Sequence, residues 1–171
     1  MSKSFATAIL ILGCMLGSSQ AAELHLGDLR IDWLDGYKET GGSSPIHLVG
    51  PDGVNVLVTV WSATPKVDSD PTTDAQTAFS SIATARLPEL AAAQGKVVLP
   101  LQREVLPDGS VLYFTATQAG SRRRPEFYLQ YMLVAPSAKA ALFTVEGKGD
   151  AMLEHPRFLE RFSSVRWADA R

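Results

Sequence analysis

The chain has 171 residues, of which 46% are hydrophobic and 20% are charged, and its formal net charge at pH 7 is −2. This length and composition are typical of one globular domain that buries enough surface to fold without disulfides or metals. Because the chain has no basic excess for the phosphate backbone of DNA or RNA, nucleic acid is not expected among its partners.

Residues 1–21 have the features of a secretory signal peptide. Lys3 provides a short positive region, residues 5–16 form an apolar stretch, and small residues follow up to Ala21. The apolar stretch is too short to cross a membrane as a helix. We expect cleavage near Ala21, a periplasmic location, and one mature domain over residues 22–171, which carries 15 basic and 18 acidic side chains.

A lipid anchor is the alternative for the N-terminus. Residues 11–14, Ile-Leu-Gly-Cys, resemble a lipobox, in which Cys14 would be lipidated and become the mature N-terminus. Leu12 is bulky for its position in such a motif, and the signal would be short, so we favour the cleaved signal peptide. Cys14 is the only cysteine, so the mature domain has no disulfide.

The first part of the mature chain is rich in strand signals. Residues 29–33 alternate apolar and polar side chains and predict a strand. Residues 38–45 contain a Gly-Gly-Ser-Ser run and predict a loop. Residues 46–49 and 54–62 predict a hairpin around the Pro-Asp-Gly turn at positions 51–53.

A helix is expected over residues 74–93, where alanines and larger apolar residues recur at helical spacing. Thr73 and Gln76 fit a capping box, Pro88 is expected to kink or split the helix, and Gly95 suits its end. The acidic residues just before and at its start, Asp68, Asp70 and Asp74, lack the spacing and the closing Glu of a calcium loop, so we interpret them as complementing the helix dipole.

Four β-rich segments follow and predict an antiparallel meander. They are residues 97–106, 111–117, 126–134 and 140–146, with a Pro-Asp-Gly turn at 107–109 and a polar loop at 118–125. In the third segment both alternating faces are apolar, and only Gln130 interrupts them. Because an antiparallel sheet usually leaves one face to water, two apolar faces indicate covering layers on both sides, most simply helices.

The chain closes with a second helical region. Asp150 suits an N-cap, Pro156 suits a first helical turn, and His155 just before it is expected at the helix entry. His47, by contrast, is expected to be exposed on an edge strand. The residues that we predict for the core are Phe79, Phe114, Leu129, Tyr131, Phe143 and Phe162.

The element order is strand, hairpin, long helix, four-strand meander and C-terminal helix, and the chain ends with Phe158, Phe162, Val165 and Trp167 at close spacing. Over residues 24–167 this pattern resembles PsbP-like and DcrB-like domains. The resemblance implies an α/β/α sandwich and accessory, chaperone or binding roles, and it carries over no functional residue. We therefore predict an α+β fold: a central antiparallel sheet of about six strands with helices packed on both faces.

No catalytic, cofactor or metal signature is found in the sequence. His25, His47 and His155 have no ligand partner at helical spacing, and nucleophile-elbow, phosphate-loop and dinucleotide fingerprints are absent. We expect no cofactor and no enzymatic activity. An enzyme stays an alternative, because carboxylates such as Glu104, Asp108 and Glu126 could converge in three dimensions.

One local feature is unusual: Arg122, Arg123 and Arg124 are consecutive in the loop between two predicted strands. Guanidinium groups suit carboxylates and phosphates, so the three arginines are the candidate contact for a partner, and a solvated loop that deters edge aggregation is the alternative. We predict a periplasmic, non-enzymatic accessory or protein-binding module whose partner is another envelope protein. The alternative is a small-molecule-binding protein or enzyme with a pocket between sheet and helix.

Overall fold

A computed structural model describes residues 22–41, 45–62 and 71–168 of the chain. The expected signal peptide, the lipidation candidate Cys14 and the acidic residues Asp68 and Asp70 lie outside these residues. Among the described residues, no helix combines the length and apolar character that crossing a membrane requires.

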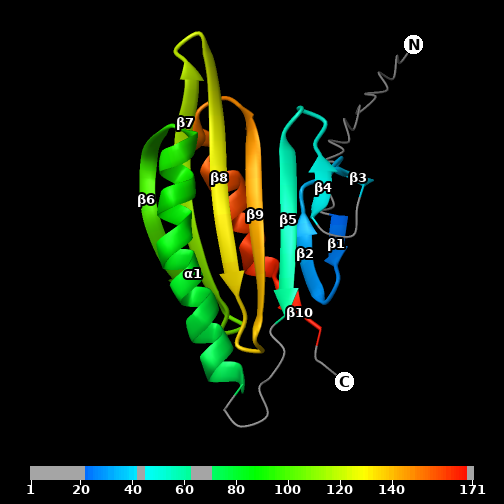
Figure 1. Cartoon of the computed structure of the whole chain (residues 1–171). Coiled ribbons are helices and arrows are strands. Elements are labelled where there is room, and N and C mark those ends of the chain that lie inside the picture. The colour runs from blue at the N-terminus through cyan, green and yellow to red at the C-terminus, as the bar shows by residue number, and fades with distance from the viewer. Residues whose placement is uncertain (1–21, 42–44, 63–70, 169–171) are drawn as a thin grey trace, which may run out of the picture.

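The centre of the domain is an antiparallel sheet in which seven strands of the described chain take the order β3-β4-β5-β9-β8-β7-β6 (Figure 1). The strands are β3 (Lys38–Gly41), β4 (Ile46–Val49), β5 (Asn55–Ser62), β6 (Lys96–Val105), β7 (Val111–Ser121), β8 (Arg124–Val134) and β9 (Lys139–Lys148). The four-strand meander and the β4–β5 hairpin are thus confirmed, and β9 pairs with β5 to join them into one sheet.

Both faces of this sheet are covered, as the two apolar faces of the meander predict. The long helix α1 (Pro71–Gln94) lies over β6, β7 and β8 on one face (Figure 1). The other face carries α2 (Ala151–Leu159), the 3-10 helix η1 (Glu160–Ser164) and a small sheet. That sheet has the order β1-β2-β10 and consists of β1 (Ala22–Leu26), β2 (Leu29–Trp33) and β10 (Arg166–Trp167).

Aromatic side chains join the small sheet and α2 to the large sheet. Trp33 of β2 stacks on Phe143 of β9 with ring centroids 5.7 Å apart, and it meets Phe158 of α2 at 6.0 Å. Phe162 of η1 meets Tyr131 at 4.8 Å and Phe143 at 5.1 Å. Because buried aromatic pairs stabilise beyond their area alone, this cluster fixes the second layer on the sheet.

The face beneath α1 has a separate apolar core. Ala83 and Leu87 of the helix pack with Tyr113, Met132 and Val134 of β7 and β8. The small side chain of Ala83 allows the helix to approach the sheet closely. Of the six predicted core residues, Phe79 is only half-buried at the flank of α1, and the other five are buried.

Several local predictions were wrong at the backbone level. Residues 38–41 form the edge strand β3 rather than a loop, because pairing with β4 needs backbone groups and not apolar side chains. Residues 118–121 and 124–125 belong to the paired strands β7 and β8 rather than to a loop, and they leave a two-residue turn. Pro88 does not split α1, which continues through it, whereas the alternative of a kink there stays a prediction. Pro156 lies inside α2, which begins five residues earlier, at Ala151.

Truncation of the aromatic cluster should destabilise the fold. Phe143→Ala and Phe162→Ala should each lower the free energy of unfolding by ~3–5 kcal/mol, because each deletes a fully buried ring and leaves a cavity. Phe79→Ala is the matched control and should cost clearly less, since Phe79 is half-buried. Urea denaturation measures all three. Losses below about 1 kcal/mol for both buried positions would contradict this packing.

Candidate partner-binding site

The hairpin formed by β7 and β8 extends beyond its neighbours in the sheet. The last pairs with adjacent strands are Lys96 with Gln118 and Glu126 with Lys148, whereas β7 and β8 stay paired with each other up to Ser121 and Arg124. Residues 119–125 therefore project past the sheet, and Figure 1 shows the hairpin tip standing clear of β6 and β9.

Gln118 fixes the base of this hairpin to the start of α2. Its Nε2 donates to the carbonyl oxygens of Glu126 at 2.7 Å and Gly149 at 3.0 Å, and its Oε1 accepts from the backbone N–H of Ala151 at 2.9 Å. The N–H of Gly149 also donates to the carbonyl of Pro125. One side chain thus connects β7, β8 and the β9–α2 turn.

Gly120 shapes the hairpin above this base. Its φ is +73°, a region that favours glycine, and a Cβ at this position would lie 2.3 Å from the carbonyl oxygen of Arg124. No side chain fits there without a shift of the backbone. The path of the chain into the tip therefore depends on this glycine.

The three arginines that the sequence singles out form the turn of the hairpin. Arg122 and Arg123 are the turn residues, Arg124 begins β8, and all three are exposed. No carboxylate of the described chain forms an ion pair with them. Their charges are consequently available to a partner.

A hollow of about 580 Å³ lies beside the tip. Three basic side chains line it, those of Arg123, Arg124 and Lys148. Glu126 and Gly149 also contribute to the lining. Lys148 comes from β9, and the β8–β9 register opposes it to Glu126. The hollow extends the basic surface from the turn to the neighbouring strand. Lys148 could not be assigned to this site from the sequence, because the β8–β9 register that places it there comes from tertiary pairing.

The carboxylates considered for catalysis do not converge. Glu104 pairs with Leu112 near the start of β7, and Asp108 binds the N–H and hydroxyl of Ser110 in the adjoining turn. Glu126 pairs with Ala119 at the opposite end of the same strand, roughly 24 Å away at 3.4 Å per residue. In the described part of the chain, no three His, Cys, Asp or Glu side chains lie close enough together to hold a metal ion.

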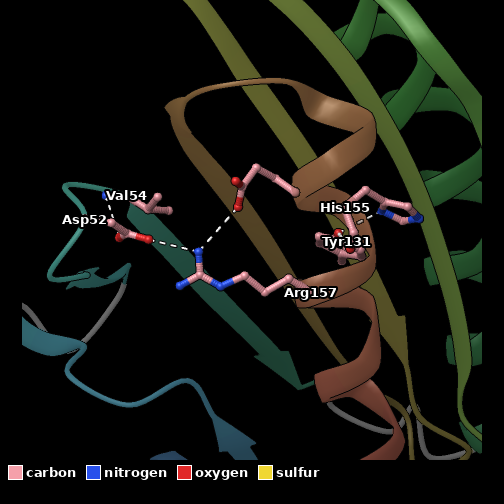
Figure 2. Close-up of polar contacts among 6 residues, drawn as sticks. Asp52, Val54, Tyr131, His155 and Arg157 are labelled. Carbon is pink, nitrogen blue, oxygen red and sulfur yellow. Dashed lines mark hydrogen bonds and ion pairs between the residues drawn. The ribbon is translucent and has the colours of Figure 1, made fainter.

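His155 lies in the core and not at a helix entry, which corrects the sequence prediction. Its Nδ1 lies 2.9 Å from the hydroxyl of Tyr131, which also donates to the His155 carbonyl at 3.2 Å (Figure 2). The imidazole stacks on the rings of Phe114 and Tyr131. Burial lowers the pKa of His155 and raises the pKa of Tyr131. The expected helix entry was wrong because it rested on Pro156 in a first turn, whereas the helix begins at Ala151, directly after its cap Asp150.

A second polar cluster connects α2 to the β4–β5 turn. Arg157 donates to Oδ2 of Asp52 at 2.9 Å and to Glu154 at 3.3 Å, and Oδ1 of Asp52 accepts from the N–H of Val54 (Figure 2). Burial alone would raise the pKa of Asp52, but the hydrogen bonds from Arg157 and Val54 lower it. Burial, with the charge of Asp52, raises the pKa of Tyr37 to about 12. The shifted pKa values of Asp52 and Tyr37 therefore follow from burial and from contacts that join α2 to the β4–β5 turn.

His47 lies in β4, inside the sheet edge formed by β3. Its side chain is half-buried, and Nδ1 lies 3.1 Å from the hydroxyl of Thr40. The expectation of an exposed edge histidine was therefore wrong, because β3 adds a further strand outside β4. His25 is exposed and lies 3.3 Å from the carboxylate of Glu23.

No protein-family model matches the sequence, and no curated protein matches it. Solved structures do resemble the chain in fold. A crystal structure from Bacteroides thetaiotaomicron VPI-5482 has 6% identity and a TM-score of 0.53, over 88% of this chain and 49% of that chain, so this protein spans about half its length. The Ran-binding protein Mog1p of Saccharomyces cerevisiae has 8% identity and a TM-score of 0.50, over 86% of this chain and 94% of that chain.

A solution structure of cyanobacterial PsbP (CyanoP) from Synechocystis sp. PCC 6803 has 16% identity and a TM-score of 0.49, over 91% of this chain and 98% of that chain. At such identities the likenesses concern the fold alone. The DcrB-like part of the resemblance in the sequence stays a prediction.

Removal of the Gln118 side chain should loosen the hairpin base. Gln118→Ala should lower the free energy of unfolding by ~1–3 kcal/mol, because it leaves the N–H of Ala151 and two carbonyls without their partner. Gln102→Ala is the control, since the exposed side chain of Gln102 donates to the carbonyls of its near neighbours Pro100 and Leu101 and not to another element of the described chain. It should change stability by less than about 0.5 kcal/mol. Equal effects of the two substitutions in urea denaturation would contradict the role of Gln118.

Acid should destabilise the protein through His155. Since burial lowers the pKa of His155 in the folded protein, the unfolded chain takes up its proton first. The contribution of the neutral His155 imidazole to the free energy of unfolding is complete above its ordinary pKa of 6.5. It is lost as the pH falls from there toward the lowered pKa of the folded protein. The free energy of unfolding should therefore decrease as the pH falls below about 6.5, and His155→Gln should flatten this slope. An unchanged slope in the variant would rule out His155 as its source.

Proposed function

We propose that this protein is a periplasmic, non-enzymatic accessory module that binds an acidic surface of another envelope protein through the β7–β8 hairpin tip. The observation that carries the proposal is the projection of three arginines beyond both neighbouring strands, on a hairpin whose base is fixed by Gln118. None of the three forms an ion pair within the part of the chain that the structure describes. A fixed base lowers the conformational entropy that binding costs, which favours association.

The chemistry of the tip specifies the kind of partner. Each guanidinium can hold a carboxylate through two parallel hydrogen bonds, and the hollow adds the ammonium group of Lys148. The whole chain has a net charge of −2, so the basic charge is a local feature of the hairpin and not a general property of the surface. A local positive surface steers a complementary acidic protein and fixes its orientation.

Two further observations support this function. Mog1p, which shares the fold, is a Ran-binding protein, so this architecture is used for protein binding elsewhere. The signal peptide expected in residues 1–21 supports export to the periplasm, and lipidation at Cys14 is the alternative. The intact mass of the exported protein distinguishes cleavage near Ala21 from a lipidated Cys14.

Replacement of the tip charges should weaken partner binding and leave the fold intact. The variant carries Arg122→Ser, Arg123→Ser and Arg124→Ser, and its free energy of unfolding should change by less than about 0.5 kcal/mol per position, because the side chains are exposed. In affinity capture from periplasmic extract, the wild type should recover a partner protein. The triple Ser variant should fail to recover it. Association of the recovered protein with the wild type should slow as salt rises.

The matched control removes the same charge elsewhere. It carries Arg30→Ser, Lys38→Ser and Arg86→Ser, three exposed positions away from the hairpin tip, and it should retain the partner. Recovery of no protein above background would contradict the binding function. Equal recovery by both triple variants would show that the arginines only solvate the turn.

A further inference from the structure

A polar groove lies between α1 and the β6–β7 hairpin, away from the arginine tip. It has a volume of about 370 Å³. Gln76, Thr77, Ser80, Ser81 and Thr84 of α1 form one wall, and Arg103, Val111 and Tyr113 complete the lining from β6 and β7. The groove exists because this flank of the helix carries small hydroxyl side chains, which leave the angle between helix and sheet unfilled.

Tyr113 brings a phenol side chain to the lining of this groove. Its side chain packs in the core beneath α1 and is only 6% exposed, yet it lines the groove. Among the described residues its hydroxyl has no hydrogen-bond partner, and its oxygen is accessible to solvent rather than sealed in the core. A hydroxyl that is open to solvent in this way can donate to a bound group.

The other lining groups are mainly donors. Arg103 is exposed and has no ion pair with a carboxylate of the described chain, and it opposes Tyr113 in the β6–β7 register. The hydroxyls of Ser81 and Thr84 donate within the helix, to the carbonyls of Thr77 and Ser80. The hydroxyls of Thr77 and Ser80 have no such partner among the described residues, and they remain free to donate.

We infer that this groove binds a small ligand through an oxyanion, a phosphate or carboxylate group, held by Arg103 and Tyr113. Among the residues that the structure describes, no carboxylate lines the groove, and the charged group in its lining is the Arg103 guanidinium. A guanidinium beside neutral hydroxyl donors is a suitable set for an anionic oxygen group. The helix hydroxyls of Thr77 and Ser80 complete the contact, and the free volume is sufficient for a small metabolite. This site is independent of the hairpin tip and its partner.

Titration of the isotope-labelled full chain with inorganic phosphate, and separately with acetate, tests the site by nuclear magnetic resonance. Sodium chloride at equal ionic strength is the reference. Saturable shifts are expected at the amides of residues 76–84 and of Arg103 and Tyr113. A response to phosphate alone identifies a phosphate ester as the ligand class, and a response to acetate alone identifies a carboxylate.

Two variants make the test specific. Tyr113→Phe removes the hydroxyl and keeps the ring in the core, and Arg103→Gln removes the charge. Each should weaken binding about tenfold, the loss expected for one charge-assisted or buried hydrogen bond. The triple Ser variant of the hairpin tip should bind as the wild type does. Absence of saturable shifts with both anions, shifts confined to the hairpin tip, or undiminished binding by both groove variants would overturn the inference.

Discussion

The architecture depends on the burial of the β7–β8 hairpin on both faces. Phe127, Leu129 and Tyr131 face the aromatic cluster, while Met132 and Val134 face α1. A slip of one residue in either strand would exchange these two faces, so the register is strongly specified. The same register determines where the strands leave the core, and it thereby sets how far the arginine tip projects beyond β6 and β9.

The two candidate sites arise where the covering layers end. At one end of β7, the hydroxyl flank of α1 leaves the groove at Tyr113 open, and at the other end Arg122 and Arg123 are exposed. Tyr113 and Ser121 are eight positions apart on one strand, roughly 27 Å at 3.4 Å per residue. Groups so far apart with no shared contacts contribute independently, so partner binding at the tip does not require an occupied groove.

The sequence was sufficient for the fold class and for most elements, because alternation, turn residues and capping are local signals. The strands of the meander, the extent of α1 and the Asp150 cap could all be predicted in this way. Strand β3 and the upper part of the hairpin were missed, since backbone pairing there is not accompanied by apolar alternation.

For the candidate site, the arginines were visible as a charge run, whereas Gln118, Lys148 and the groove depend on contacts between segments distant in sequence. Gln118 reaches Gly149 and Ala151 across more than thirty positions. The role of His155 was hidden for the same reason, because its partner Tyr131 lies on another element. Polar residues of this kind acquire their function only from tertiary pairing.

Site-specific photo-crosslinking in cells that make the protein tests most directly whether the hairpin tip is the partner surface. A photoreactive residue replaces exposed Ser121 at the tip, and a second version carries it at exposed Gln102 on β6. We expect an adduct from position 121 with one envelope protein through a segment rich in Asp and Glu, and no such adduct from position 102. No adduct at the tip, or the same adduct from both positions, would contradict this expectation.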